Sequence, residues 1–131
     1  MNPFGYPAPV WRLFRETPRA GELDAPDHVA AATTPASRAR LSLQVKMSGT
    51  RIGDARFQAY GCPTTIAVGA HVAGQVVGRE ARELAAIDAK SIKEALEIPD
   101  DRTHCALLGE DLVRSLLSQV GRAPAPAAVA R

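Results

Sequence analysis

Three side chains in this sequence, Cys62, His104 and Cys105, are of the types that bind a soft metal ion or carry sulfur. Each cysteine stands where the residue pattern predicts that a helix begins, Cys62 after a strand and Cys105 after a polar loop. Unpaired backbone N–H groups and the positive end of the helix dipole lower the pKa of a thiol at such a position. A thiolate attacks sulfur and binds metal, and the imidazole of His104 suits zinc or iron. The pattern therefore predicts a site with up to three nitrogen and sulfur ligands.

A simpler interpretation of the same residues stays open. Cys105 also falls on the apolar stripe of its predicted helix, and buried cysteines are usually inert small hydrophobic residues. His71 lies inside a helix that is apolar on nearly all sides, so we expect a core or partner-facing histidine there and not a ligand. Trp11 and Phe14 are three residues apart, which is typical of a patch that docks a short helix.

The composition excludes several classes of protein. The chain has 131 residues, of which 46% are hydrophobic and 23% charged, as in one ordinary globular domain. A net charge of +2 gives no reason to expect nucleic acid or an anionic membrane as a partner. Two cysteines cannot build a disulfide-rich scaffold or a four-cysteine metal site within one chain. No apolar run approaches the length of about 20 residues that spans a bilayer, and residues 1–9 lack the basic start of a secretory signal. We therefore expect a cytoplasmic protein with free thiols.

The elements that must position these residues are a small sheet and several helices. Apolar and polar residues alternate over 41–47 and about 51–60, which predicts two strands joined by a tight turn at Ser48-Gly49. A weaker pattern over 29–33 indicates a short edge strand within a segment, 23–40, that is otherwise loop-like. The predicted helices are 10–16, 63–77, 80–86, 88–96 and about 104–120.

These elements predict the fold class and the organisation of the chain. We expect an α+β fold in which an antiparallel sheet of two to three strands packs against about four to five helices. Residues 1–9 form an extended arm and 10–121 form the domain. Residues 122–131 are a Pro/Ala tail with nothing to bury, which we expect to be disordered.

The residues around the two cysteines form two distinctive passages. They read Asp54-Ala-Arg-Phe-Gln-Ala-Tyr-Gly-Cys62 and His104-Cys105-Ala-Leu-Leu-Gly-Glu-Asp111. The first resembles the "DARF…YGC" passage, and the second the "HCS-L-(A/G)-ED" passage, of the IscU/NifU-type iron–sulfur cluster assembly scaffold family (the N-terminal NifU-like domain). Pro18-Arg19 with Gly21 is similar to that family's "NPRN-G", and Leu43-Gln44-Val45-Lys46 to its "LQIKV" strand. The resemblance extends from about residue 10 to residue 120.

The resemblance implies a compact α+β scaffold that is not an enzyme and whose ligand loops meet at one end. Members of the family hold zinc or a nascent iron–sulfur cluster with three cysteines, aided by an aspartate and a histidine. They receive sulfur as persulfide from a cysteine desulfurase and pass clusters to client proteins. By position, Cys62 corresponds to the middle cysteine, Cys105 to the last cysteine and usual persulfide acceptor, and His104 to the histidine beside it. The implied cofactors are a transient iron–sulfur cluster or zinc.

The sequence departs from the family's pattern at the first cysteine and its aspartate. In the family both lie in an "Ala-Cys-Gly-Asp" loop before the first clear strand. Aligning the "LQ" pair places Ser37 and Ala39 at these two positions, and a shift of one residue places Ala36 and Arg38 there. Neither alignment restores a thiol or a carboxylate, so a stable cluster held by this chain alone is not expected.

Two further departures flank the thiols. The loop Ile98-Pro99-Asp100-Asp101-Arg102 stands where the family's chaperone-recognition loop reads "Leu-Pro-Pro-Val-Lys", so two acidic charges are added to it. Pro63 follows Cys62, where the family commonly has a small residue, and stiffens the turn into the helix.

Two functions are consistent with these features. The first is an atypical scaffold or sulfur relay that binds metal or accepts sulfur through Cys62, His104 and Cys105, with a partner supplying a missing ligand where one is needed. The second is an adaptor or accessory subunit that keeps the fold to bind a desulfurase, a client or a larger complex. We favour the first, because both cysteines and the histidine stand where the family uses them.

Overall fold

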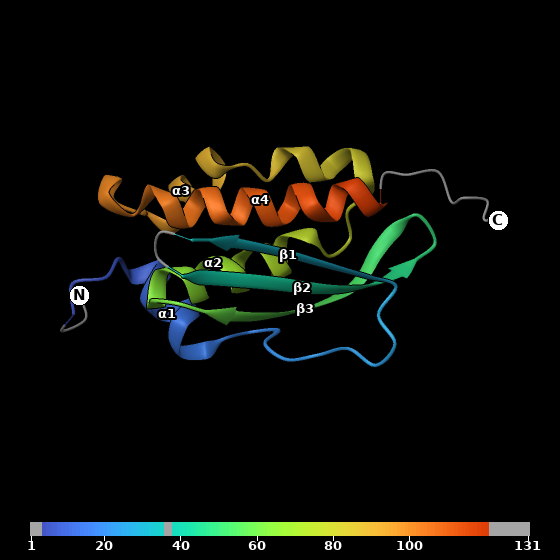
Figure 1. The fold of residues 1–131 in the computed structure, drawn as a ribbon, viewed down its shortest axis with the longest axis horizontal. Helices are drawn as coiled ribbons and strands as arrows, with labels where there is room; N and C mark the ends of the chain where they lie inside the picture. Colours follow the sequence, from blue (N-terminus) through green and yellow to red (C-terminus); the bar gives the residue numbers. More distant parts are fainter. Residues whose placement is uncertain (1–3, 36–37, 121–131) are drawn as a thin grey trace.

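The structure is a computed structural model that describes residues 4–35 and 38–120. Three antiparallel strands, β1 (His28–Thr34), β2 (Ala39–Ser48) and β3 (Arg51–Tyr60), form one sheet in the order β1-β2-β3. The helices are α1 (Ala8–Glu16), α2 (Pro63–Val76), α3 (Ala89–Leu96) and α4 (Thr103–Val120), with two short 3₁₀ helices, η1 (Ala81–Ala86) and η2 (Asp100–Arg102). The arrangement confirms the predicted α+β class (Figure 1).

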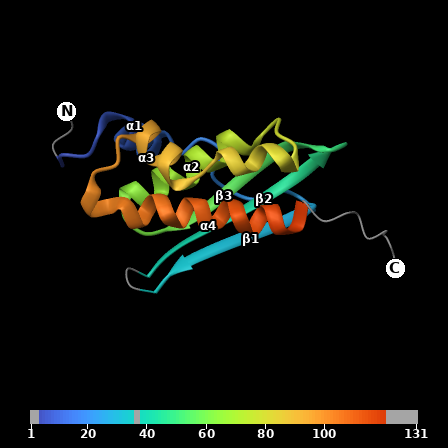
Figure 2. The ribbon, with the colours of Figure 1, turned by 90° about the horizontal axis from the view of Figure 1, so that it is seen from above.

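The molecule has two layers, because the helices cover one face of the sheet (Figure 2). On β2 every second side chain from Ala39 to Val45 is buried, and the residues between them are exposed or half-buried. Helix α2 packs against β2 and β3, and α4 packs against β1 and β2. The alternation seen in the sequence therefore separates a buried face from a polar outer face.

Close packing of the two long helices depends on glycines at their contacts. A Cβ built on Gly69 of α2 would lie 2.6 Å from the ring of Phe57 on β3. A Cβ on Gly109 of α4 would lie 2.6 Å from Val68 of α2 and 2.9 Å from Ile92 of α3. Only a residue without a Cβ allows these approaches, so the glycines set how closely α2 approaches β3 and how closely α4 approaches α2 and α3.

The chain between α1 and β1 covers the outer edge of β3. Phe57 donates its N–H to the carbonyl of Arg19 and accepts from the N–H of Gly21, both at 2.9 Å. The guanidinium of Arg19 also donates to the Asp54 carboxylate at 2.9 Å, where Arg56 donates as well at 2.6 Å. Burial raises the pKa of Asp54, but the N–H of Ala55, followed by Arg56 and Arg19, lowers it by more, so the pKa lies below its ordinary value. Hydrogen bonds thus join two of the passages compared with the IscU/NifU family, the one around Arg19 and Gly21 and the one that begins at Asp54.

Several boundaries differ from the sequence-based expectation. Strand β1 is longer than the predicted 29–33, and it pairs with β2 along its whole length from His28 to Thr34. This confirms the predicted edge strand, and only the flanking residues differ from expectation, because β1 extends over 28–34 and β2 already begins at Ala39. Helix α1 begins at Ala8, inside the predicted arm, with Pro9 in its first turn. The predicted helix over 80–86 is a 3₁₀ helix, and the polar loop before α4 contains another.

Some of the predicted organisation lies outside what the structure describes. The predicted tail falls within residues 121–131, and the start of the predicted arm falls within residues 1–3, both of which lie outside the described residues. Within 4–35 and 38–120, no helix combines the length and apolar character needed to cross a membrane.

Candidate thiol site

Both cysteines stand at helix starts, Cys62 between β3 and α2 and Cys105 in α4. The end of β3 and the starts of α2 and α4 lie at one end of the molecule, at the left in Figure 1. Cys62 is the N-cap residue of α2, and Pro63 occupies the first turn, where its missing N–H costs no hydrogen bond. Cys105 lies in the first turn of α4. Because α2 packs on both the sheet and α4, two segments far apart in sequence meet here.

The hydroxyl of Thr65 joins the two thiols. Thr65 Oγ1 lies 3.6 Å from the Cys62 Sγ and 3.7 Å from the Cys105 Sγ. Thr65 and Cys105 are each only 1% exposed, whereas Cys62 is half-buried. The structure therefore brings together the two predicted thiols, with one sulfur facing solvent in part and the other enclosed.

Cys62 is held as a thiolate. Its pKa falls to about 4, chiefly because the Cys105 thiol donates toward its sulfur, with further help from the Thr65 hydroxyl and against the opposing effect of burial. The N–H groups of Thr64 and Thr65 also lower this pKa, although neither forms a hydrogen bond of true N-cap geometry, so they act as oriented dipoles. The guanidinium of Arg102 donates to Cys62 Sγ at 3.3 Å. The sequence-based expectation of a low-pKa thiol is met at this cysteine.

The same expectation was wrong for Cys105. Its pKa is raised, first because its thiol donates toward the Cys62 thiolate, and second because burial disfavours the anion. Like Cys62, it stands at the start of a helix, so the helix dipole alone does not decide the ionisation of a thiol. Only one of the two is a ready nucleophile.

Arg102 reaches Cys62 because the loop before α4 is held in place. The ammonium group of Lys93 donates to Asp100 at 2.6 Å and to the Thr103 hydroxyl at 2.9 Å. The Thr103 hydroxyl in turn donates to the Asp100 carbonyl at 2.9 Å. These contacts fix η2 just after Pro99, and the added acidic residue Asp100 serves as an anchor for this turn.

The N-terminal residues complete the surroundings of Arg102. The guanidinium carbon of Arg102 lies 5.4 Å from the ring centroid of Tyr6, and the Tyr6 ring stacks on Trp11 at 6.1 Å. Trp11 also contacts Phe14, as expected for a docking patch, and Phe4. An aromatic cluster at the start of the chain therefore adjoins the positively charged partner of the thiolate.

The described residues do not assemble a complete metal site. Within 4–35 and 38–120, no group of three or more His, Cys, Asp or Glu side chains is placed to hold one ion. His104 is exposed and does not join the two thiols in such a group. Of the positions aligned with the family's first cysteine and aspartate, Ala36 and Ser37 lie outside the described residues, Arg38 is exposed and Ala39 is buried.

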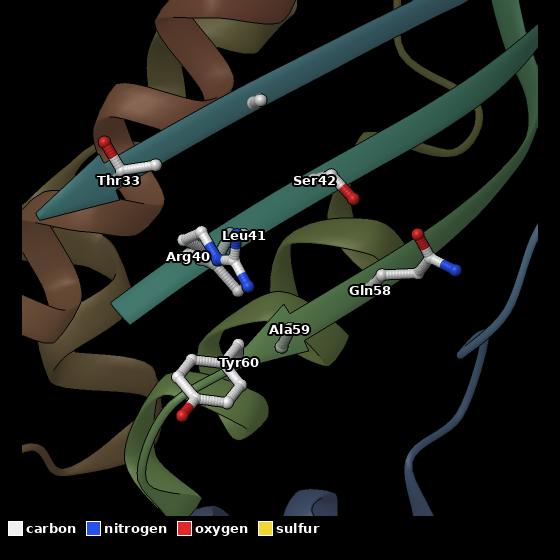
Figure 3. Close-up of a pocket in the computed structure, with 8 residues that line it drawn as sticks. Thr33, Arg40, Leu41, Ser42, Gln58, Ala59 and Tyr60 are labelled. Atoms are coloured by element: carbon white, nitrogen blue, oxygen red, sulfur yellow. The ribbon is translucent and has the colours of Figure 1, made fainter. Parts of the chain in front are cut away.

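Two other features lie apart from the thiols. His71 is half-buried in α2, and burial lowers its pKa, as expected of a packed histidine. An open pocket of about 350 Å³ lies on the outer face of the sheet (Figure 3). Two rows of paired residues that cross the three strands line it, Ala31-Ser42-Gln58 and Thr33-Arg40-Tyr60. The Arg40 guanidinium lies over the Tyr60 ring there at 5.3 Å. Neither cysteine lines this pocket, so its shape does not bear on the sulfur chemistry.

The sequence passages, the fold and the paired thiols are consistent with one another, and comparison with known proteins accounts for them. The model of the NifU-like N terminal domain matches residues 5–122. The chain belongs to this family. It is 33% identical over 108 residues to the iron–sulfur cluster assembly scaffold protein IscU of Haemophilus influenzae, an alignment that covers 79% of this chain and 86% of that protein. It is also 37% identical over 79 residues to Escherichia coli IscU, which covers 60% of this chain and 62% of that protein.

Solved structures agree on the fold. A protein assigned as an iron–sulfur cluster assembly scaffold for the SUF system of Fervidobacterium islandicum superposes with a TM-score of 0.71 at 15% identity, over 83% of this chain and 93% of that one. The N-terminal part of a NifU-like protein from Brucella abortus superposes with a TM-score of 0.57 at 21% identity, over 87% of this chain and 81% of that one. The NifU-like chain thus keeps the family's fold with two cysteines in the described site.

Three contributors to the site were not identified from the sequence. They are Thr65, Arg102 and Tyr6. Thr65 stands three residues after Cys62 at a predicted helix start, a spacing at which side chains return to the N-cap, so this one had a local signal. Arg102 stands three residues before Cys105 but contacts the other cysteine, and Tyr6 reaches the site from the far end of the chain. No local pattern encodes these two contacts.

Proposed function

We propose that this NifU-like protein takes part in iron–sulfur cluster assembly by handling sulfur at Cys62 and Cys105, with the cluster as its cargo. The observation that carries the proposal is the convergence of the two thiols on Thr65 Oγ1, with one sulfur held as an anion. The relatives named as IscU scaffolds support the same assignment. A cysteine desulfurase as sulfur donor and iron–sulfur client proteins as acceptors are the expected partners. The protein needs no catalytic turnover of its own, and its free thiols suit a reducing, cytoplasmic setting.

The donor set limits how this chain would hold metal. Two thiolates supply half of a tetrahedral zinc site, and soft metals favour them. The exposed His104 would have to turn toward the sulfurs to add a third ligand, or a partner protein would have to donate one. Arg102 already donates to Cys62, so a metal ion would have to displace this guanidinium. Zinc or a cluster bound through Cys62, His104 and Cys105 is therefore proposed as a transient state.

Anaerobic purification followed by cluster reconstitution tests this function. Zinc, iron and persulfide are measured in the purified protein, and reconstitution is tried with and without a cysteine desulfurase. We expect cluster or persulfide in the wild type and strong losses in Cys62→Ala and Cys105→Ala. Ser42→Ala, on the outer face of the sheet, is the matched control and should behave as the wild type does. The proposal fails if the wild type, alone and with desulfurase, carries neither metal, cluster nor persulfide.

An adaptor role is the second candidate, and exposed apolar residues favour it. Tyr60 precedes the Cys62 turn and is 63% exposed, Leu107 follows Cys105 and is 49% exposed, and Phe4 in the aromatic cluster is 70% exposed. Apolar side chains gathered at one end are typical of a contact surface. If desulfurase binding survives both cysteine substitutions while Tyr60→Ser or Leu107→Ser abolishes it, the fold serves as a docking surface.

A further inference from the structure

The two thiols differ in access and in hydrogen bonding, and together they could do more than carry sulfur. We propose that they form a sulfide-releasing pair, in which Cys62 accepts a sulfane sulfur and Cys105 then expels it as hydrogen sulfide while the two cysteines form a disulfide. The proposal rests on the proposed function, because it assumes that sulfur is delivered to this site. It would supply sulfur in the reduced form that an iron–sulfur cluster contains.

Sulfur enters at Cys62 because this sulfur is the accessible one. Cys62 is half-buried at the rim of the site, whereas Cys105 is 1% exposed. The Cys62 sulfur contacts Arg102 Nη1 at 3.3 Å and Thr65 Oγ1 at 3.6 Å, which keep it oriented. A bulky donor such as a protein persulfide can therefore reach Cys62 at the surface. To reach Cys105 it would have to displace core side chains.

The first step is a thiol exchange that conserves electrons. The Cys62 thiolate attacks the outer sulfur of the donor persulfide, a new S–S bond forms, and the S–S bond of the donor breaks. The donor leaves as a thiolate, and Cys62 carries one added sulfur. Arg102 lies beside the attacking sulfur, where it also attracts the terminal sulfur that Cys62 then carries.

In the second step the buried thiol acts as the resolving group, because the first step has consumed the Cys62 thiolate toward which it donated. The Cys105 sulfur forms a bond to Cys62 Sγ, and the bond from Sγ to the outer sulfur breaks. The outer sulfur leaves with that electron pair and with the proton of the Cys105 thiol, as hydrogen sulfide. The two cysteine sulfurs are together oxidised by two electrons, and the released sulfur gains both. A dithiol reductant is required to restore the pair for another round.

Packing argues against simple relay of the sulfur onto Cys105. A persulfide there would need room for an additional sulfur atom beside a side chain that is 1% exposed. Its polar contact, Thr65 Oγ1, is equally buried, and Ala106 and Leu108 beside it on α4 belong to the core. Interiors packed this closely do not admit an extra heavy atom without strain. Attack on the inner sulfur requires only that the two existing sulfurs approach each other.

A single-turnover experiment tests the release. The reduced protein is mixed anaerobically with glutathione persulfide, and hydrogen sulfide, free thiols and intact mass are followed. In the wild type we expect one sulfide for each chain, loss of both thiols, and a mass lower by two hydrogens. In Cys105→Ser and Cys105→Ala, sulfide release should fall at least about tenfold, and the mass of one added sulfur should appear on Cys62. Cys62→Ser should neither load nor release, while Ser42→Ala should match the wild type.

Other results would overturn the proposal. Accumulation of a persulfide on Cys105 of the wild type would show relay, and a stable persulfide on Cys62 with Cys105 still reduced would show simple carriage. Circular dichroism and thermal melting establish that each variant is folded, and the paired Ser and Ala substitutions separate polarity from loss of the thiol. If the wild type assembles a cluster from supplied inorganic sulfide but releases none from the persulfide, this proposal fails and the proposed function stands. If it takes up neither sulfur nor metal, both fail.

Discussion

The turn at Cys62 and the start of α4 at Cys105 are alike in sequence and opposite in chemistry. Each cysteine stands at the beginning of a helix, where the dipole favours a thiolate. Cys62 is half-buried and accepts chiefly from the Cys105 thiol, with further help from Thr65, so its pKa falls to about 4. Cys105 is buried and donates toward that anion, so its pKa rises. The contrast shows that the neighbours brought by the fold outweigh the helix dipole in setting the reactivity of a thiol.

Alkylation is the strongest test of this contrast. The wild-type protein is used because each thiol is the largest influence on the pKa of the other, and peptide mass spectrometry separates alkylation of Cys62 from that of Cys105. With iodoacetamide at about neutral pH, we expect Cys62 to react at least about tenfold faster, because it is ionised and accessible. Its rate should stay flat as the pH falls from neutrality until acidic conditions protonate it. Mass spectrometry of timed samples measures both rates, and equal rates at the two cysteines of the folded protein would refute the contrast.

The contrast also depends on how closely α4 approaches α2. Gly109→Ala places a Cβ 2.6 Å from Val68 and should cost about 1–3 kcal/mol of unfolding free energy. It should also slow disulfide formation between the thiols, because the first turn of α4 moves away. Gly74→Ala is the matched control, since a Cβ there meets nothing within 4 Å and should be neutral or stabilising by up to about 1 kcal/mol. Urea unfolding measures both, and equal stability of the two variants would contradict the packing argument.

The two thiols should give opposite dependences of stability on pH. The folded-state pKa of Cys62 lies below its ordinary value of 9.0, so the unfolded chain binds more protons and stability rises with pH up to about 9. The pKa of Cys105 is raised, so above about pH 9 the folded chain keeps a proton that the unfolded chain loses, and stability falls.

Urea unfolding between about pH 7 and pH 10 checks these slopes. Each should be smaller than the limit of about 1.4 kcal/mol per pH unit that one proton gives, since Cys62 is partly screened by solvent. Cys62→Ser should remove the rise and also weaken the fall, because the Cys62 thiolate is the first cause of the raised Cys105 pKa. Cys105→Ser should remove the fall. A wild-type profile without a maximum would show that the two thiols are not coupled in this way.

The smallest effect is expected at His104. Because His104 is exposed and lies outside any group of metal-ligating side chains in the described residues, His104→Ala should leave the alkylation rates of both thiols unchanged. Zinc titration of the same variant sharpens the comparison. A large loss of zinc affinity would show that His104 turns toward the thiols on binding, whereas unchanged affinity would leave the metal to the two sulfurs and a partner.

Much of the fold was predictable because its signals are local. The alternation over 41–47 marked β2, and the unbroken apolar stripe from Cys105 to Val120 marked α4. Strand β1 was underestimated because its pairing partner lies across a loop, and 3₁₀ geometry at 81–86 does not differ in composition from an α-helix. The sequence indicated that both cysteines stand at helix starts, whereas Arg102 reaches Cys62, and Tyr6 reaches Arg102, only through tertiary contacts.

By itself the sequence determined the family, the α+β class, and the fact that two thiols and one histidine stand at helix starts in a chain with no cysteine at the aligned first position. Residue order and periodicity carry this information. The tertiary structure alone decided that Cys62 and Cys105 share one threonine hydroxyl, that Arg102 contacts the first and burial encloses the second, and that His104 stays apart. Ionisation and access depend on neighbours distant in sequence, so the division of roles between two similar cysteines emerges only when the chain is folded.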